Sequence, residues 1–221
     1  MRYIKKIMIA ARVISLIFTP FYLPTVGLLA LFTLSYLSLL PTSYKLMVLA
    51  IVYLFTVLLP TFLIHLYRRY QNWNLIELGQ RERRMVPYVI SILCYFMCVY
   101  IMKAMHIPHF MASIVIAALG IQIICAIINA WWKISTHLAA IGGVVGAVMA
   151  FSVIFAYNPI PWLCTTILLA GILGTSRMVL RQHSLSEVLG GFAVGVVVGT
   201  FLMMILIVGE SVSFIVNIKT I

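Results

Sequence analysis

The chain has 221 residues, of which 64% are hydrophobic and 9% are charged, and its mean hydropathy is +1.17. Soluble domains average about 45–50% apolar and about 25% charged residues, so this composition excludes a soluble protein and indicates an integral membrane protein. The net charge of +11 is typical of a membrane protein whose basic residues lie in cytoplasmic loops or contact anionic membrane lipids. No basic helix or fold motif accompanies the charge, so nucleic acid is not an expected partner.

The first apolar segment runs from about residue 14 to residue 40 and contains Pro20 and Pro24. Each proline removes one helix hydrogen bond. We therefore expect either one long, kinked crossing or a short interfacial helix over residues 4–19, followed by a crossing over residues 25–40.

Six further apolar segments follow, and a membrane-crossing helix needs roughly 20 apolar residues. They cover about residues 44–67, 86–101, 110–130, 138–156, 162–174 and 188–208. The pattern predicts an all-α, polytopic transmembrane helix bundle of about six to seven spans. We divide the chain into N-terminal membrane segments (1–67), a membrane core (68–208) and a short C-terminal tail (209–221).

Two short polar segments interrupt the core. The first is Ser135-Thr136-His137, and the second runs from Ser176-Arg177 through His183 to Glu187. An ionisable side chain within a bilayer costs about 3 kcal/mol or more, so such residues are usually paired or functional. Two spans separate the basic stretch at 68–84 from the first polar segment, and two more lead to the second. All three should therefore emerge on one membrane face.

Glycines recur every four residues on two predicted spans. Gly142 and Gly146 lie on the fifth, and Gly191, Gly195 and Gly199 lie on the seventh. Small residues at this spacing allow helix backbones to approach closely in lipid. We expect these two helices, which begin beside His137 and Glu187, to pack in the bundle interior.

The polar residues supply the parts needed for phosphoryl transfer through a histidine. His183 can attack phosphorus, and Glu187, four residues on, can orient its ring. His137 can protonate the leaving oxygen, while Arg177 and Ser135 can bind the phosphate.

Plainer explanations exist for each residue. Ser184-x-x-Glu187 is also a capping box for the seventh span, and the two roles of Glu187 need not exclude each other. His137 and His183 can be solvated histidines at helix ends, and Arg177 can be an ordinary charged flank. The four cysteines lie in apolar runs as small hydrophobes, with no disulfide framework or metal cluster indicated.

The second polar segment resembles the third signature of the type 2 phosphatidic acid phosphatase superfamily, which includes the vanadium haloperoxidases. That signature is Ser-Arg, five residues, His, three residues, Asp. Ser176, Arg177 and His183 match it, and Glu187 stands where aspartate is usual. The family's Pro-Ser-Gly-His signature corresponds to Ile134-Ser135-Thr136-His137, where serine and histidine match.

The family's first signature, Lys, six residues, Arg-Pro, is only partly present. The run Arg81-Glu82-Arg83-Arg84-Met85-Val86-Pro87 occupies its place without its pattern. The resemblance covers about residues 68–208. It implies that His183 is the nucleophile, His137 the general acid and Glu187 the group that orients His183.

The resemblance also implies the phosphate ligands, which would be Arg177, Ser135 and Ser176, with Arg83 or Arg84 from the first signature. It implies no metal or other cofactor. The expected substrate is a lipid phosphate monoester or an isoprenoid phosphate or pyrophosphate, whose tail can stay in lipid. The alternatives are a non-catalytic relative that binds anionic lipid headgroups and, less favoured, a small transporter. The sequence gives no oligomeric state.

The side of the membrane on which the site lies is open to two arguments. If the first segment crosses, the motif face carries 12 of the lysines and arginines and the opposite face carries 3. The positive-inside rule then places the site in the cytoplasm. Bacterial lipid phosphatases of the resembling family usually face outward from the inner membrane. We prefer the outward face, because active-site cations are not topology signals.

Overall fold

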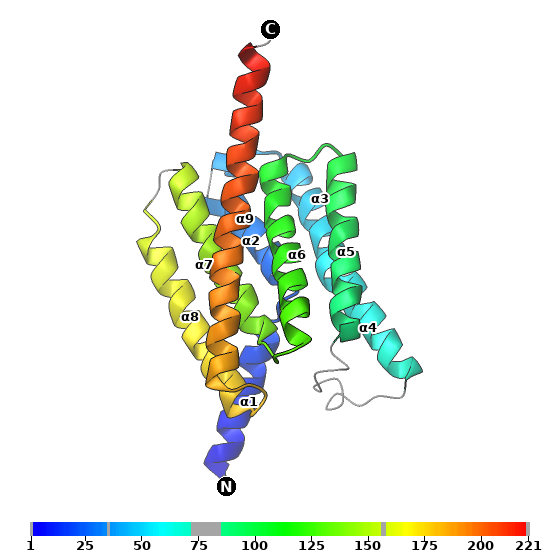
Figure 1. Cartoon of the computed structure of the whole chain (residues 1–221), viewed down its shortest axis with the longest axis vertical. Coiled ribbons are helices and arrows are strands. Elements are labelled where there is room, and N and C mark those ends of the chain that lie inside the picture. Colours follow the sequence, from blue (N-terminus) through cyan, green and yellow to red (C-terminus); the bar gives the residue numbers. More distant parts are fainter. Residues whose placement is uncertain (1, 35, 72–84, 156–157, 220–221) are drawn as a thin grey trace.

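The computed structural model describes residues 2–34, 36–71, 85–155 and 158–219. Over these ranges the chain is helical and contains no strand, which confirms the predicted all-α transmembrane bundle (Figure 1). In chain order the elements are α1 (Arg2–Ile17), α2 (Leu23–Leu34), the short turn η1 (Tyr36–Leu39), α3 (Thr42–Tyr53), η2 (Leu54–Leu58), α4 (Leu59–Tyr70), α5 (Met85–Ala104), α6 (His109–Asn129), α7 (Thr136–Phe155), α8 (Ile160–Val179) and α9 (Leu185–Lys219).

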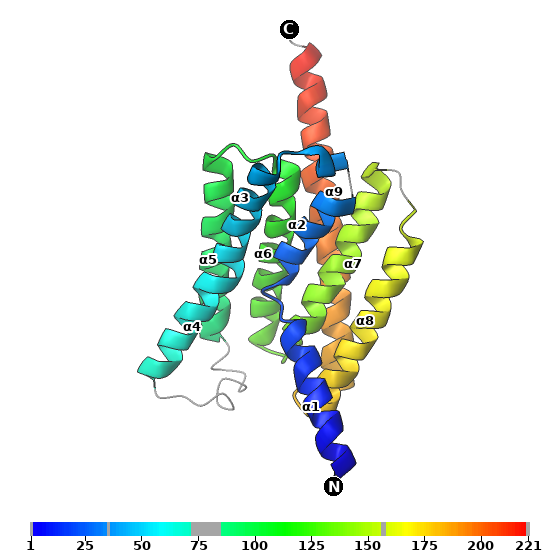
Figure 2. The ribbon, with the colours of Figure 1, turned by 180° about the vertical axis from the view of Figure 1, so that it is seen from behind.

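The first apolar segment forms two helices that follow one another along the bundle axis (Figure 2). The break contains Pro20, and α2 begins with Pro24 in its first turn, where a missing N–H costs little. With 12 residues, α2 spans only about 18 Å, which is less than the roughly 30 Å hydrocarbon core. The structure thus divides the segment into two helices, and α2 by itself is too short to cross the hydrocarbon core.

The second apolar segment is one continuous rod over Thr42–Tyr70, with a π-helical turn at η2. Pro60 lies two residues after this turn and has no N–H to give to the carbonyl of Thr56. The wider turn accommodates that missing bond. Thr56 is fully buried, and its hydroxyl donates a hydrogen bond to the carbonyl of Val52 at 2.8 Å.

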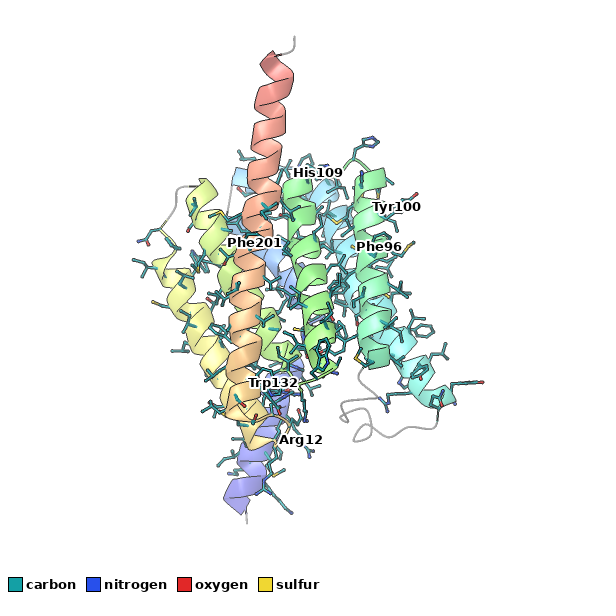
Figure 3. The ribbon with its side chains drawn as sticks, in the orientation of Figure 1. Arg12, Phe96, Tyr100, His109, Trp132 and Phe201 are labelled. Carbon is teal, nitrogen blue, oxygen red and sulfur yellow. The ribbon has the colours of Figure 1, made fainter. Side chains whose placement is uncertain are left out.

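The outer surface of the bundle is apolar. Phe96 and Tyr100 on α5 and Phe201 on α9 are at least 60% exposed and project outward (Figure 3). Six helices are long and apolar enough to cross a membrane. An apolar exterior of this kind is stable only in lipid, so the protein is an integral membrane protein.

The helix ends that border the polar segments lie at one end of the bundle. The end of α4, the starts of α5 and α7, and the α8–α9 connection all occupy the lower end in Figure 1. The N-terminus of α1 lies at this end too. The predicted common face is thus confirmed for the described residues.

The glycine contact between α7 and α9 is also confirmed. A β-carbon built on Gly191 would lie 2.5 Å from the carbonyl oxygen of Ser135, and one on Gly146 would lie 2.6 Å from the backbone nitrogen of Thr200. At Gly199 it would lie 3.0 Å from the α-carbon of Gly143. These separations leave no room for side chains, so the two backbones touch along most of their shared length.

Two predicted boundaries differ from the structure. The sixth span was expected to end near residue 174, but α8 continues to Val179, so Ser176 and Arg177 belong to its last turns rather than to a loop. A C-terminal tail was expected from residue 209, but α9 continues to Lys219 without a break. The last turns of α9 extend beyond the rest of the bundle at the upper end of Figure 1.

Replacing Gly195 by alanine should destabilise the protein, because the new methyl group would collide with the backbone of Ala139 and Gly143 on α7. We expect a loss of about 1–3 kcal/mol, as for other overpacked sites. Gly171→Ala is the matched control, since its methyl group would meet no atom within 4 Å. That change should be neutral or stabilising by up to about 1 kcal/mol. Thermal unfolding in detergent measures both, and equal midpoints would contradict the close packing.

Candidate functional site

The two polar segments meet at the lower end of the bundle, between the end of α8 and the starts of α7 and α9 (Figure 1). In the described part of the chain, nine polar or charged residues are buried, and two of them are basic: Arg177 and His183, at 8% and 7% exposure. Both belong to the second polar segment. Burying such groups is costly, which marks this region as the candidate site.

The end of α8 is shaped by a Schellman motif. The N–H of Gln182 donates to the carbonyl of Arg177 at 3.1 Å, and the N–H of Arg181 donates to that of Met178 at 2.9 Å. Arg181 adopts a left-handed φ of 52° to close the turn. This geometry satisfies carbonyls that the helix end would leave unpaired and directs the chain toward His183.

His183 is oriented by Glu187. The Nδ1 atom of His183 lies 2.7 Å from Oε2 of Glu187, one helical turn away, and the imidazole side chain is only 1% exposed. With the carboxylate accepting from Nδ1–H, the neutral ring carries its proton on Nδ1 and its lone pair on Nε2. The longer side chain of glutamate therefore reaches the position that aspartate would serve in the resembling family.

The predicted capping box is present as well. The N–H of Glu187 donates to the hydroxyl of Ser184, and the N–H of Ser184 donates to Oε2 of Glu187, both at 3.4 Å. The same carboxylate oxygen thus caps α9 and holds His183. Its contact with His183 is shorter by 0.7 Å, the difference between 3.4 Å and 2.7 Å. Orientation of His183 is therefore the stronger of its two interactions.

The first polar segment is bonded directly to the second. The N–H of Ser135 donates to the carbonyl of Glu187 at 3.3 Å, and the ammonium of Lys133 donates to the carbonyl of Gln182 at 2.6 Å. Ser135 precedes α7 and is fully buried, and its hydroxyl has no hydrogen-bond partner among the described residues. A buried hydroxyl beside a helix N-terminus is a ready donor for an anion.

Arg177 has a partner that the sequence did not reveal. Its Nη1 donates to the hydroxyl of Ser15 on α1 at 2.5 Å, and both residues are buried. Ser15 was missed because it looks like a small polar residue in an apolar run. The available signal was its spacing of four from Ala11, which is also buried and lies on the same side of α1.

No interaction with His183 is established for the other predicted site residues. Ser176 donates its hydroxyl to the carbonyl of Ile172 within α8 and borders a cleft against α1, so it is not brought to His183. His137 lies in the first turn of α7 and is half-buried. The predicted ligands Arg83 and Arg84 lie outside the described residues.

Packing holds the site in place from within the bundle. Leu138 on α7, Leu173 on α8 and Val188 on α9 form one buried cluster directly behind the polar residues. Trp132 packs on the other side, against the start of α9 (Figure 3), where its ring fills the space that a side chain at Gly190 would need.

Comparison of the chain with models of protein families, with curated proteins and with solved structures finds no match.

The two roles of Glu187 can be separated by substitution. Glu187→Ala should abolish the preference of His183 for the Nδ1–H tautomer, because the acceptor at 2.7 Å is lost. Ser184→Ala should keep that tautomer and cost only about 0.5–2 kcal/mol of stability through the weakened cap. The ¹⁵N chemical shifts of labelled histidine report the tautomer, and thermal unfolding reports the cap. An unchanged His183 spectrum in Glu187→Ala would contradict the orienting role.

Proposed function

We propose that the protein is a metal-independent membrane phosphatase that acts through a phosphohistidine on a lipid phosphate monoester or an isoprenoid phosphate or pyrophosphate. The observation that carries the proposal is the buried His183, held through Nδ1 by Glu187 at 2.7 Å. The backbone carbonyl of Glu187 in turn accepts a hydrogen bond from the N–H of Ser135, in the other polar segment. A buried nucleophile with an orienting carboxylate beside anion donors is the arrangement that such a reaction needs.

In the first step, Nε2 of His183 attacks phosphorus, and the bond from phosphorus to the leaving oxygen breaks. His137 gives its proton to that oxygen, which leaves as an alcohol or as a phosphate. The positive charge on the His183 ring is stabilised by Glu187 through Nδ1–H.

In the second step, water attacks the phosphohistidine. His137, now neutral, takes a proton from the water, the nitrogen–phosphorus bond breaks, and inorganic phosphate leaves with both histidines restored. Arg177 and the hydroxyl of Ser135 stabilise the charge on the transferring phosphoryl group, and N–H groups at the start of α7 add to them. Arg83 or Arg84 completes this set of phosphate ligands.

The position of the site suits a membrane substrate. It lies at the end of the bundle, where a phosphorylated headgroup can reach Arg177 while its hydrocarbon chain remains in the bilayer. We place the protein in a bacterial inner membrane, in lipid metabolism, with the site on the outer face.

A second candidate is a non-catalytic relative that binds anionic lipid headgroups. The observation that favours it is the bond from Arg177 to Ser15, which engages the guanidinium within the protein. It predicts lipid binding without turnover, so the experiment below separates the two functions.

The proposal is tested by phosphate release from detergent-purified protein in EDTA, over phosphatidate, phosphatidylglycerophosphate and polyprenyl pyrophosphate. His183→Ala should lower the rate by at least about 10³-fold, as loss of a nucleophile does elsewhere. His65→Ala is the control, because His65 is exposed on α4 and has no role in the proposed reaction. Wild-type rates in His183→Ala would refute the mechanism, and binding without release by the wild type would favour the second candidate.

Ser15 should act as a positioning residue for Arg177. Ser15→Ala should raise KM about two- to tenfold, the equivalent of one hydrogen bond of 0.5–1.5 kcal/mol, and change kcat less. Ser15→Thr keeps the hydroxyl and should restore KM. Ser113→Ala is the matched control, because Ser113 is also buried but lies near the start of α6, at the other end of the bundle. A matching rise of KM in Ser113→Ala would show a general packing effect.

A further inference from the structure

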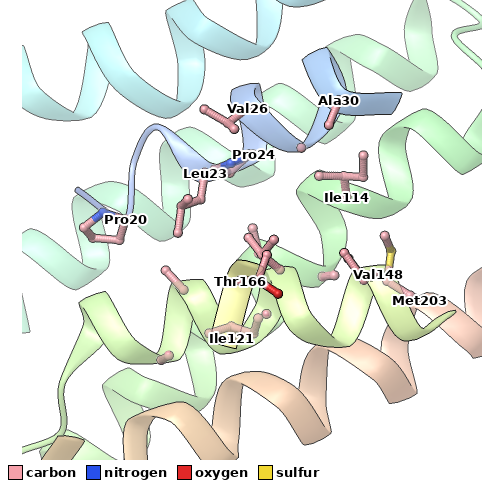
Figure 4. Close-up of a pocket in the computed structure, with 18 of the residues that line it drawn as sticks. Pro20, Leu23, Pro24, Val26, Ala30, Ile114, Ile121, Val148, Thr166 and Met203 are labelled. Carbon is pink, nitrogen blue, oxygen red and sulfur yellow. The ribbon is translucent and has the colours of Figure 1, made fainter. Parts of the chain in front are cut away.

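A large apolar cavity lies inside the bundle (Figure 4). Its volume is about 750 Å³, and α2, α6, α7 and α8 contribute most of its lining. We call it the α2–α8 groove, after the two helices that form its opposite walls. Figure 2 shows these helices on either side of α7.

The groove exists because α7 presents small residues to it. Ala139, Ala140, Gly143 and Ala147 line its floor, where larger side chains would fill the space. Its rim carries Val26 on α2 and Trp162 on α8, which are 52% and 43% exposed. The groove is partly open rather than enclosed, which would give a hydrocarbon chain access from the bilayer.

One end of the groove adjoins the candidate site. Thr136 lines it and lies between Ser135 and His137 in the chain. The lining continues along α7 as far as Phe151, 15 residues on, or about 22 Å at the helical rise. The groove thus runs from the level of the site through most of the roughly 30 Å hydrocarbon core.

We propose that the α2–α8 groove holds one long hydrocarbon chain of the phosphorylated substrate, with the phosphate beside Ser135 and His183. This inference rests on the proposed function and adds where the chain of the substrate binds. The volume falls within the range of about 300–1,000 Å³ that is typical of small-molecule sites, and the lining is mostly apolar. One wall comes from α2, which lies outside the 68–208 region that resembles the phosphatase superfamily.

The groove is tested by photolabelling in phosphatidylcholine vesicles. The probe is a long-chain alkyl monophosphate with a diazirine at the end of its chain, added to the full-length protein. We expect labelling of α2, α6 and α7 next to the groove. Ala147→Phe should reduce it by about tenfold, the equivalent of about 1.4 kcal/mol, because the ring would fill the floor of the groove.

Two further variants make the result specific. Thr166→Phe blocks the groove from the α8 wall (Figure 4) and should have the same effect, which guards against misfolding of a single variant. Val153→Phe adds the same ring on α7 at a position that is 67% exposed to lipid, and it should leave labelling unchanged. Thermal unfolding in detergent confirms that each variant is folded.

Competition identifies the chain. Polyprenyl phosphate and phosphatidate are each added as competitors, and a lipid whose chain fits the groove should displace the probe. The stronger competitor identifies the class of lipid that the groove binds. Displacement by neither would overturn the inference, as would equal labelling by a photoreactive phosphatidylcholine, since the groove would then hold ordinary bilayer lipid.

Hydrolysis separates this inference from the proposed function. Ala147→Phe should raise KM for a long-chain phosphate about tenfold and leave a short-chain, water-soluble phosphate unaffected. Groove labelling without any phosphate release would uphold the groove and refute the phosphatase. Phosphate release that does not depend on chain length, without labelling, would do the reverse.

Discussion

The backbone contact between α7 and α9 is the constraint on which the rest of the structure depends. Glycines on both helices leave no side chains to separate them, so the backbones pack closely. In lipid, this van der Waals packing drives helix association in place of the hydrophobic effect that acts in water. The same contact brings Ser135 against the first turn of α9, where its N–H meets the carbonyl of Glu187. The candidate site is therefore a product of helix packing, and the polar loops complete it.

A second constraint comes from buried charge. Arg177 and His183 are held away from water, and each is stabilised by a short bond to a side chain: Ser15 in one case and Glu187 in the other. The two partners differ in kind. A carboxylate orients a neutral imidazole and can balance a positive charge on that ring, whereas a neutral hydroxyl orients a guanidinium without removing its charge. An arginine that keeps its charge in a buried setting is suited to binding a phosphate.

The N-terminal helices extend the site beyond the region with a family resemblance. Through Ser15, α1 contacts Arg177, and α2 forms one wall of the α2–α8 groove. In the proposed function, α1 would support the headgroup site and α2 would contact the hydrocarbon chain. The kink at Pro20 permits this, because it lets α1 follow α8 while α2 leans toward α6 and α7.

The helical bundle, its membrane setting, the common face of the polar segments and the glycine contact could all be predicted from the amino-acid sequence. These follow from local composition and from spacings of four residues, which depend on helix geometry alone. The capping box and the reach of Glu187 to His183 are also local, since they span one helical turn. Three features became visible only in the folded chain: Ser15 binds Arg177, Ser176 donates to a carbonyl of its own helix, and α2 and α8 enclose a groove. Those features depend on how distant helices tilt and pack. Tilt and packing result from many weak contacts together, which no local sequence pattern reveals.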